Sequence, residues 1–269
     1  MFDSYDREIN YLRISVTDKC NLRCRYCMPA EGVPHRSHEE FLSLEQMAAV
    51  VRVGVRLGLT KVRLTGGEPL VKRGIVELVR LIREVPGVRH LGMTTNGVLL
   101  PRYADSLRRA GLDSVNISLD TLDPERYREI TRVGDIRHVL KGIEAARRAG
   151  FPIKINMVVL EDTGPEEIAA MRRFCERRPG AKGLTLQLIN HYELGEEKLD
   201  RYCFDRPPRC SACNKIRLLA DGTLKPCLHS NEEIKLDPEH IEESLRRTIA
   251  AKPERGDVCT NRPMVEIGG

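Results

Sequence analysis

The chain has 269 residues, of which 31% are charged and 41% hydrophobic, a composition typical of folded domains. Aromatic residues make up 4%, tryptophan is absent, and the net charge of +5 is spread along the chain. These values disfavour a nucleic-acid-binding protein, which needs stacking platforms or a concentrated basic patch. No apolar run long enough to span a membrane and no signal-peptide pattern occurs, so we expect a cytoplasmic protein without nucleic-acid or membrane partners.

Short β-rich segments alternate with amphipathic helical patterns, which predicts a parallel sheet with crossover helices. The expected strands cover 11–17, 61–67, 90–97, 114–120, 152–160 and 183–189. Helices are expected after the capping box of Ser43 and Gln46, over 75–82, from Asp123-Pro124, over 136–149, and from Pro165. Six β/α units are fewer than the eight of a closed barrel, so the fold class expected is α/β, a partial (β/α)6 TIM-like barrel.

The strand pattern breaks after residue 190 into an irregular polar stretch. We therefore expect a barrel over 1–190 and a small C-terminal auxiliary-cluster module over 191–269. One more helix is expected to begin at Asp237-Pro238.

The expected strands carry apolar residues on one face and polar residues on the other. The polar face includes Arg13, Arg63 and Lys154, and in a barrel this face lines the lumen. Such a lumen suits an anionic ligand, since buried cations need partners. The alternative is an antiparallel sheet with one solvent-facing side, which the intervening helices disfavour.

Six of the nine cysteines form two close groups. Cys20, Cys24 and Cys27 have C-x3-C-x2-C spacing, and Cys210, Cys213 and Cys227 have C-x2-C-x13-C spacing. Three thiolates leave one iron of a four-iron cluster open, whereas a zinc ion would need a fourth ligand. His35 or His38 could complete the first group, and Cys203, His229 or Cys259 the second. The sequence assigns no role to Cys175.

The first cysteine group, with Tyr26 before its last cysteine, resembles the radical S-adenosylmethionine superfamily, as does the segment "LTGGEPL". The strings "YLRISVTDKCNLRCRYCMP", "CSACNKIRLLADGTLKPC" and "RPMVEIGG" resemble the GTP 3′,8-cyclase family, the first enzyme of molybdenum cofactor synthesis. The resemblance covers essentially the whole chain, which looks like a shortened member.

The resemblance implies that Cys20, Cys24 and Cys27 hold a [4Fe–4S] cluster whose open iron chelates S-adenosylmethionine. One electron then splits that cofactor to give a 5′-deoxyadenosyl radical. Cys210, Cys213 and Cys227 would hold an auxiliary [4Fe–4S] cluster that meets the purine. Cofactor contacts are implied for Tyr26, Gly66, Gly67, Glu68, Ser118 and Ile189. Substrate contacts are implied for Arg13, Arg63, Thr94, Lys154, Lys215 and Arg217, with Arg13, Lys215 and Arg217 also catalytic.

The expected substrate is therefore a small anionic molecule, GTP or a similar compound, and an electron donor is implied; a homodimer is a possible assembly. The tail Gly268-Gly269 would enter the active site, and the alternative for it is a frayed end.

Three departures from the family pattern fall on the expected GTP pocket. About twenty residues separate strand six from the second cysteine group, where the family has a longer stretch. Leu184, Thr185 and Gln187 occupy a segment that usually carries an arginine and an acidic residue, and Lys215 replaces an arginine. The alternatives are a paralogue with the same two clusters that acts on another nucleotide or a peptide, and a non-catalytic iron–sulfur or zinc protein.

Overall fold

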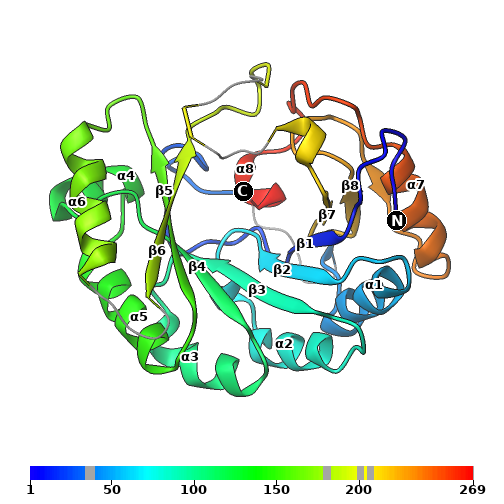
Figure 1. Ribbon diagram of the computed structural model, residues 1–269, viewed down its shortest axis with the longest axis horizontal. Helices are drawn as coiled ribbons and strands as arrows, with labels where there is room; N and C mark the ends of the chain where they lie inside the picture. The colour runs from blue at the N-terminus through cyan, green and yellow to red at the C-terminus, as the bar shows by residue number, and fades with distance from the viewer. Residues whose placement is uncertain (34–39, 178–182, 199–202, 205–208, 269) are drawn as a thin grey trace.

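A single curved sheet organises the molecule, and helices cover its outer face (Figure 1). The computed structural model describes residues 1–33, 40–177, 183–198, 203–204 and 209–268. The strand order is β6-β5-β4-β3-β2-β1-β7-β8-β9. The six strands β1 to β6 pair in parallel and span Tyr11–Ser15, Lys61–Thr65, His90–Thr95, Ser114–Ser118, Ile153–Val159 and Leu184–Asn190. The partial barrel is thus confirmed, and the antiparallel alternative is wrong.

The outer helices are α1 (Leu44–Arg56), α2 (Ile75–Arg83), α3 (Leu100–Arg109), α4 (Pro124–Thr131), α5 (Ile136–Arg148) and α6 (Pro165–Glu176). Of these, α1, α4 and α6 begin at the residues that the capping and proline signals predicted. Ser43 and Gln46 form the expected capping box, and Asp123 caps α4 with Pro124 in its first turn. Helix α3 was not predicted, and its N-cap residue, Leu99, makes no side-chain cap bond.

The C-terminal part extends the same sheet. Strand β7 (Lys215–Leu218) pairs in parallel with β1, and β8 (Thr223–Lys225) and β9 (Ile234–Lys235) continue antiparallel. The remaining elements are the 3-10 helices η2 (Pro69–Val71) and η3 (Cys210–Ala212), and the helices α7 (Ile241–Ala250) and α8 (Met264–Ile267).

The predicted start of the last long helix, at Asp237-Pro238, is wrong. Helix α7 begins at Ile241, after the N-cap residue His240. Asp237 Oδ1 accepts from Glu239 N at 2.9 Å, and the Asp237 carbonyl accepts from His240 N at 3.2 Å. The aspartate therefore closes a turn ahead of the helix.

The alternation of the strands fixes which face meets the helices. Leu12, Ile14, Val62 and Leu64 are fully buried, and each such side chain contributes about 1.5–3 kcal/mol of burial energy. A one-residue slip would exchange the two faces, so burial holds the register. The polar residues between them consequently face the inside of the curved sheet. Within the part of the chain that the structure describes, no helix has the length and apolarity needed to cross a membrane.

Candidate active site

Three arginines form a row across the inner face of the sheet. Arg13 of β1 is the register partner of Arg63 of β2 and of Arg217 of β7. Neighbouring strands lie about 4.8 Å apart, so three guanidinium side chains start next to one another on the same face. Because β7 joins the sheet at β1, residues 13 and 217 meet although they lie far apart in the chain.

A second row lies two residues earlier on the same strands. Tyr11 is the register partner of Lys61 and of Lys215. The Tyr11 hydroxyl accepts from Arg63 Nε at 2.5 Å, and Lys215 Nζ lies 5.9 Å from the centre of the Tyr11 ring. Tyr11 and Lys61 were not predicted as site residues, although both lie two positions before an arginine and thus share its face.

The arginine row is electrostatically unfavourable without an anion. Burial lowers the pKa of Arg13 to about 10, and the neighbouring charges of Arg217 and Arg63 add to the effect. Arg217 is buried, and its Nε makes no hydrogen bond within the described ranges. Buried like charges of this kind need a counter-charge.

A cavity of about 420 Å³ opens over the two rows. Its described lining contains all six predicted substrate residues, Arg13, Arg63, Thr94, Lys154, Lys215 and Arg217, and no Asp or Glu. His90, Asn116, Asn156 and Gln187 complete the polar wall. Gly92 leaves room for Arg63, because a Cβ there would lie 2.9 Å from Arg63 Nη2. The cavity therefore presents five cationic side chains on one wall and a sixth, Lys154, among the polar groups.

The first cysteine group lines a second cavity, of about 180 Å³. All three thiols, Cys20, Cys24 and Cys27, face it, as do the predicted cofactor positions Tyr26, Gly66, Gly67, Glu68, Ser118 and Ile189. Burial raises the pKa of each thiol, that of Cys27 to about 12. A metal centre that binds these residues must therefore displace thiol protons.

The glycine pair Gly66-Gly67 lets the end of β2 pack on the segment that leads to Cys20. Gly67 N donates to the carbonyl of Thr17 at 2.8 Å. A Cβ on Gly66 would lie 2.3 Å from Thr17 O, and one on Gly67 would lie 2.3 Å from Lys19 O. Any larger residue at either position would push the end of β2 away from the backbone of residues 17–19.

Two buried carboxyl groups support this cavity: Glu68 lines it, and Asp120 binds Tyr26, which lines it. Glu68 accepts from Leu70 N at 3.0 Å, Thr95 Oγ1 at 2.7 Å and Asn96 N at 2.7 Å. Burial raises its pKa to about 7, against these hydrogen bonds. Asp120, whose pKa burial raises to about 6, accepts from the hydroxyl of Tyr26 at 2.8 Å. Both carboxyl groups thus hold strand ends and Tyr26 in place.

The second cysteine group lines a third cavity, of about 60 Å³, with a cationic surrounding. Lys198 Nζ lies 3.1 Å from Cys210 Sγ, and Lys252 Nζ lies 3.4 Å from Cys213 Sγ. Burial opposes ionisation of Cys213, but the ammonium of Lys252 and neighbouring donors lower its pKa to about 7. The third cysteine, Cys227, lies in the same lining.

The residues considered as additional ligands lie in different places. His229 lines the third cavity, buried, and neither of its ring nitrogens has a hydrogen-bond partner among the described residues. Cys203 is exposed. Cys259 is buried, and its thiol donates a hydrogen bond to Asn261 Oδ1 at 3.3 Å. His35 and His38 lie outside the described residues. In the described ranges, no three His, Cys, Asp or Glu residues are grouped so that they could hold one metal ion.

The three cavities share walls. Thr94, Asn156, Ile189 and Tyr192 line both the cationic cavity and the first cysteine cavity. Lys215, Arg217 and Leu228 line both the cationic cavity and the second cysteine cavity. The two cysteine groups therefore flank one cationic chamber.

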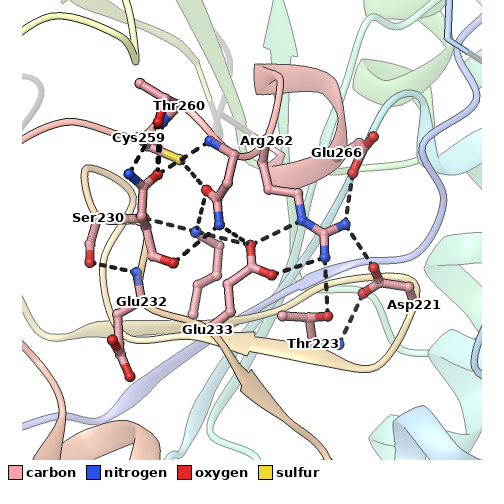
Figure 2. A network of polar contacts seen from close by, with 12 residues as sticks. Asp221, Thr223, Ser230, Glu232, Glu233, Cys259, Thr260, Arg262 and Glu266 are labelled. Carbon is pink, nitrogen blue, oxygen red and sulfur yellow. Dashed lines mark hydrogen bonds and ion pairs between the residues drawn. The ribbon is translucent and has the colours of Figure 1, made fainter.

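A partly buried arginine network fastens the C-terminal segment (Figure 2). Arg262 binds Asp221 at 2.7 Å, Glu266 at 2.8 Å and Glu233 at 3.0 Å. The carbonyl of Glu266 accepts from Ser15 Oγ at 2.8 Å, which brings α8 to the end of β1.

Gly268 lies against the end of β2 with φ of 72°, where a Cβ would meet Thr65 Cγ2 at 2.6 Å. Gly268 is thus packed rather than frayed, while Gly269 lies outside the described residues.

Comparison with known proteins identifies the family. The family model "Radical SAM superfamily" matches residues 14–175. The GTP 3′,8-cyclase of Alkaliphilus oremlandii is 41% identical over 324 aligned positions, which cover 100% of both chains. That of Alkaliphilus metalliredigens is 40% identical over 320 positions, again with 100% coverage of both. Both alignments exceed the 269 residues of this chain, which is therefore shorter than these relatives.

Among solved structures, Streptococcus suis SuiB bound to its precursor peptide SuiA aligns with a TM-score of 0.69 at 19% identity. The alignment covers 92% of this chain and 66% of SuiB, a likeness of fold. The chain belongs to the radical S-adenosylmethionine superfamily and, within it, to the family of the GTP 3′,8-cyclases.

Proposed function

We propose that this enzyme rearranges GTP, or a closely related purine nucleoside triphosphate, in the 3′,8-cyclisation of molybdenum cofactor biosynthesis. The observation that carries the proposal is the arginine row of Arg217, Arg13 and Arg63, placed between two cysteine cavities. A triphosphate supplies several adjacent negative charges, and guanidinium groups bind phosphate oxygens in pairs.

The cysteines suit the family's cofactors, S-adenosylmethionine and two [4Fe–4S] clusters. Each group offers three soft sulfur donors around a cavity, the donor type that iron–sulfur clusters take. We assign the first cluster to Cys20, Cys24 and Cys27 and the auxiliary one to Cys210, Cys213 and Cys227. When bound, the first cluster supplies the electron that cleaves S-adenosylmethionine to the 5′-deoxyadenosyl radical.

S-adenosylmethionine is assigned to the cavity of the first group, with Tyr26, Gly66, Gly67, Ser118 and Ile189 as its contacts. Glu68 is assigned an indirect part, because its carboxylate oxygens already accept from Leu70, Thr95 and Asn96. The Asp120 bond then orients the Tyr26 ring toward the cofactor.

The substrate is assigned to the chamber between the groups. Lys61, Lys215 and the arginine row would bind the phosphates. Thr94 of β3 and Lys154 of β5 would contact the sugar or base, and the base would point toward the auxiliary group through the wall that Arg217 and Leu228 share. In this arrangement the ribose lies nearest the S-adenosylmethionine cavity, which shares Thr94 and Asn156.

We also propose that residues 191–269 act as the auxiliary-cluster module of a barrel formed by 1–190. A separate electron donor and a reducing compartment such as the cytoplasm fit a chain whose described cysteines are all free. A homodimer remains part of this proposal, to be checked by light scattering.

Anaerobic reconstitution tests the proposal. We expect about eight irons per chain, formation of 5′-deoxyadenosine, and conversion of GTP to 3′,8-cyclo-GTP. Cleavage of S-adenosylmethionine with no GTP product, but with turnover of ATP or ITP, would assign a different purine nucleotide. Zinc in place of iron with no cleavage would refute the enzyme assignment.

A further inference from the structure

Lys252 is a buried cation that has no carboxylate partner among the residues that the structure describes. The residue is 3% exposed. Its Nζ donates to the carbonyls of Lys215 and Pro226, both at 2.9 Å, and to Cys213 Sγ at 3.4 Å. Within the described parts of the chain, no Asp or Glu oxygen lies within ion-pair distance of this Nζ. The group there that can carry a negative charge next to the ammonium is the thiol of Cys213, once it is deprotonated.

A second buried lysine gives the comparison. Lys225 is 0% exposed, and its Nζ has the carboxylate of Glu233 at 3.2 Å. Burying an ammonium without an opposite charge costs several kcal/mol, which is why buried lysines are normally paired as Lys225 is. Among the described residues, Lys252 departs from this rule, and it does so beside the second cysteine group.

The bonds of Lys252 also join the segments that carry the cysteines. Lys215 follows Cys213 by two residues, and Pro226 directly precedes Cys227. A single ammonium therefore fixes the distance between the backbone of the second cysteine and that of the third.

Arg7 fastens the same segment to the first cysteine of the group. Its Nη1 donates to Cys210 O at 3.0 Å and Glu254 O at 2.9 Å, and its Nη2 to Pro253 O at 2.6 Å. The carboxylate of Asp3, 2.7 Å away, balances the charge of Arg7. Lys252 therefore supplies positive charge that acts on the thiols.

The N-terminal cysteine group differs in this respect. Among the described residues, the donors that reach Cys20 Sγ are the neutral Leu22 N at 3.4 Å and Asn96 Nδ2 at 3.9 Å. The guanidinium of Arg23 binds the Cys20 carbonyl at 2.7 Å and not the sulfur. At the C-terminal group, two ammonium groups, Lys252 and Lys198, reach sulfur. Hydrogen bonds and charge at the sulfurs are the means by which a protein sets the potential of a bound cluster.

We propose that Lys252 is a positioning residue for the auxiliary cluster, whose ammonium ties the Cys213 segment to the Cys227 segment and raises the reduction potential of the cluster. This inference rests on the proposed function, which places a cluster on Cys210, Cys213 and Cys227. A positive charge next to the ligating sulfur favours the reduced, more negative cluster.

The test uses full-length protein in which Cys20, Cys24 and Cys27 are replaced by Ala, so that one cluster is observed. Its midpoint potential is measured by redox titration followed by electron paramagnetic resonance. Lys252→Met should shift the midpoint to a more negative potential, and Lys252→Arg, which keeps charge and donors, should keep it near that of the parent. Lys225→Met is the matched control, since it removes a buried lysine that touches no sulfur, and should leave the midpoint in place.

The outcomes separate the two levels of the argument. If the parent with intact Lys252 binds no iron, the cluster assignment, and with it the proposed function, is wrong. If it binds about four irons but Lys252→Met leaves the midpoint unchanged, the role of Lys252 is overturned. A Lys252→Met protein that melts like its parent yet retains no cluster supports the role. Should that variant not fold, Lys198→Met decides: a negative shift supports the cationic surrounding and an unchanged midpoint refutes it.

Discussion

Replacing Arg217 with Met should make the nucleotide-free protein more stable and its nucleotide affinity lower. The change removes one guanidinium from the row on β7, β1 and β2 and keeps an unbranched side chain in its place. Two unit charges about 5 Å apart repel by about 3 kcal/mol at an effective dielectric constant near 20. Side chains that diverge from the strands reduce this value, so we expect a gain of about 1–2 kcal/mol.

The loss of affinity follows from the same geometry. A hydrogen bond to a charged group contributes about 1.5–3 kcal/mol, which is roughly a 10- to 150-fold change in the dissociation constant. Calorimetric titration of reconstituted protein with GTP, in the absence of S-adenosylmethionine, measures this change without turnover. Differential scanning calorimetry of the nucleotide-free protein should show a melting temperature higher by about 2–4 °C for each kcal/mol gained.

Two further variants make the measurement specific. Arg217→Lys keeps the repulsion but not the forked geometry, so its melting temperature should stay unchanged while GTP binds more weakly. Arg52→Met removes an exposed arginine of α1 and should alter neither quantity. If Arg217→Met melts at a lower temperature and binds GTP like the unchanged protein, the row is not a site of stored repulsion and does not hold the phosphates.

Three other changes test the surroundings of the site. Gly67→Ala places a Cβ 2.3 Å from Lys19 O, so it should lower the free energy of unfolding by about 1–3 kcal/mol and reduce the amount of iron bound. Gly195→Ala is the control, because its Cβ meets no atom within 4 Å and should change neither quantity. Arg262→Met leaves the carboxylates of Asp221, Glu233 and Glu266 without their cation, so it should lower the free energy of unfolding in urea by roughly 3–5 kcal/mol. Arg246→Met removes an exposed ion pair with Glu242 and should lower it by less than about 1 kcal/mol. Equal losses in the two variants would contradict this reading of the network. The same ion pairs lower the pKa of Asp221 and of Glu233 against the effect of burial, so their stabilisation is complete above about pH 5 and is lost progressively as the pH falls through the lowered folded-state values. Unfolding free energies measured between pH 6 and pH 3 should fall less steeply in Asp221→Asn, and parallel curves would refute the linkage.

The sequence was informative wherever the signal was local. Alternation along β1, β2 and β5 placed Arg13, Arg63 and Lys154 on the inner face, and capping residues set the starts of α1 and α4. Both signals depend on residues a few positions apart, because side-chain direction and cap geometry are properties of short segments.

Contacts between distant segments could not be predicted by such patterns. The pairing of β7 with β1, which sets Arg217 beside Arg13, depends on tertiary packing, and so does the approach of Lys252 to Cys213. Asp237-Pro238 shows a different limit, since an aspartate caps a turn and a helix through the same side-chain acceptor.

The position of β7 has a consequence for biosynthesis of the chain. Residues 13 and 63 leave the ribosome early, while residue 217 emerges only near the end of translation, and the pairing of β1 with β7 is a contact of very high sequence separation. A nascent barrel would thus carry two arginines without their third neighbour. The nucleotide should bind only after the last quarter of the polypeptide has paired with the edge of the sheet. The bound ligand would then stabilise the contact between the N-terminal and C-terminal parts of the chain.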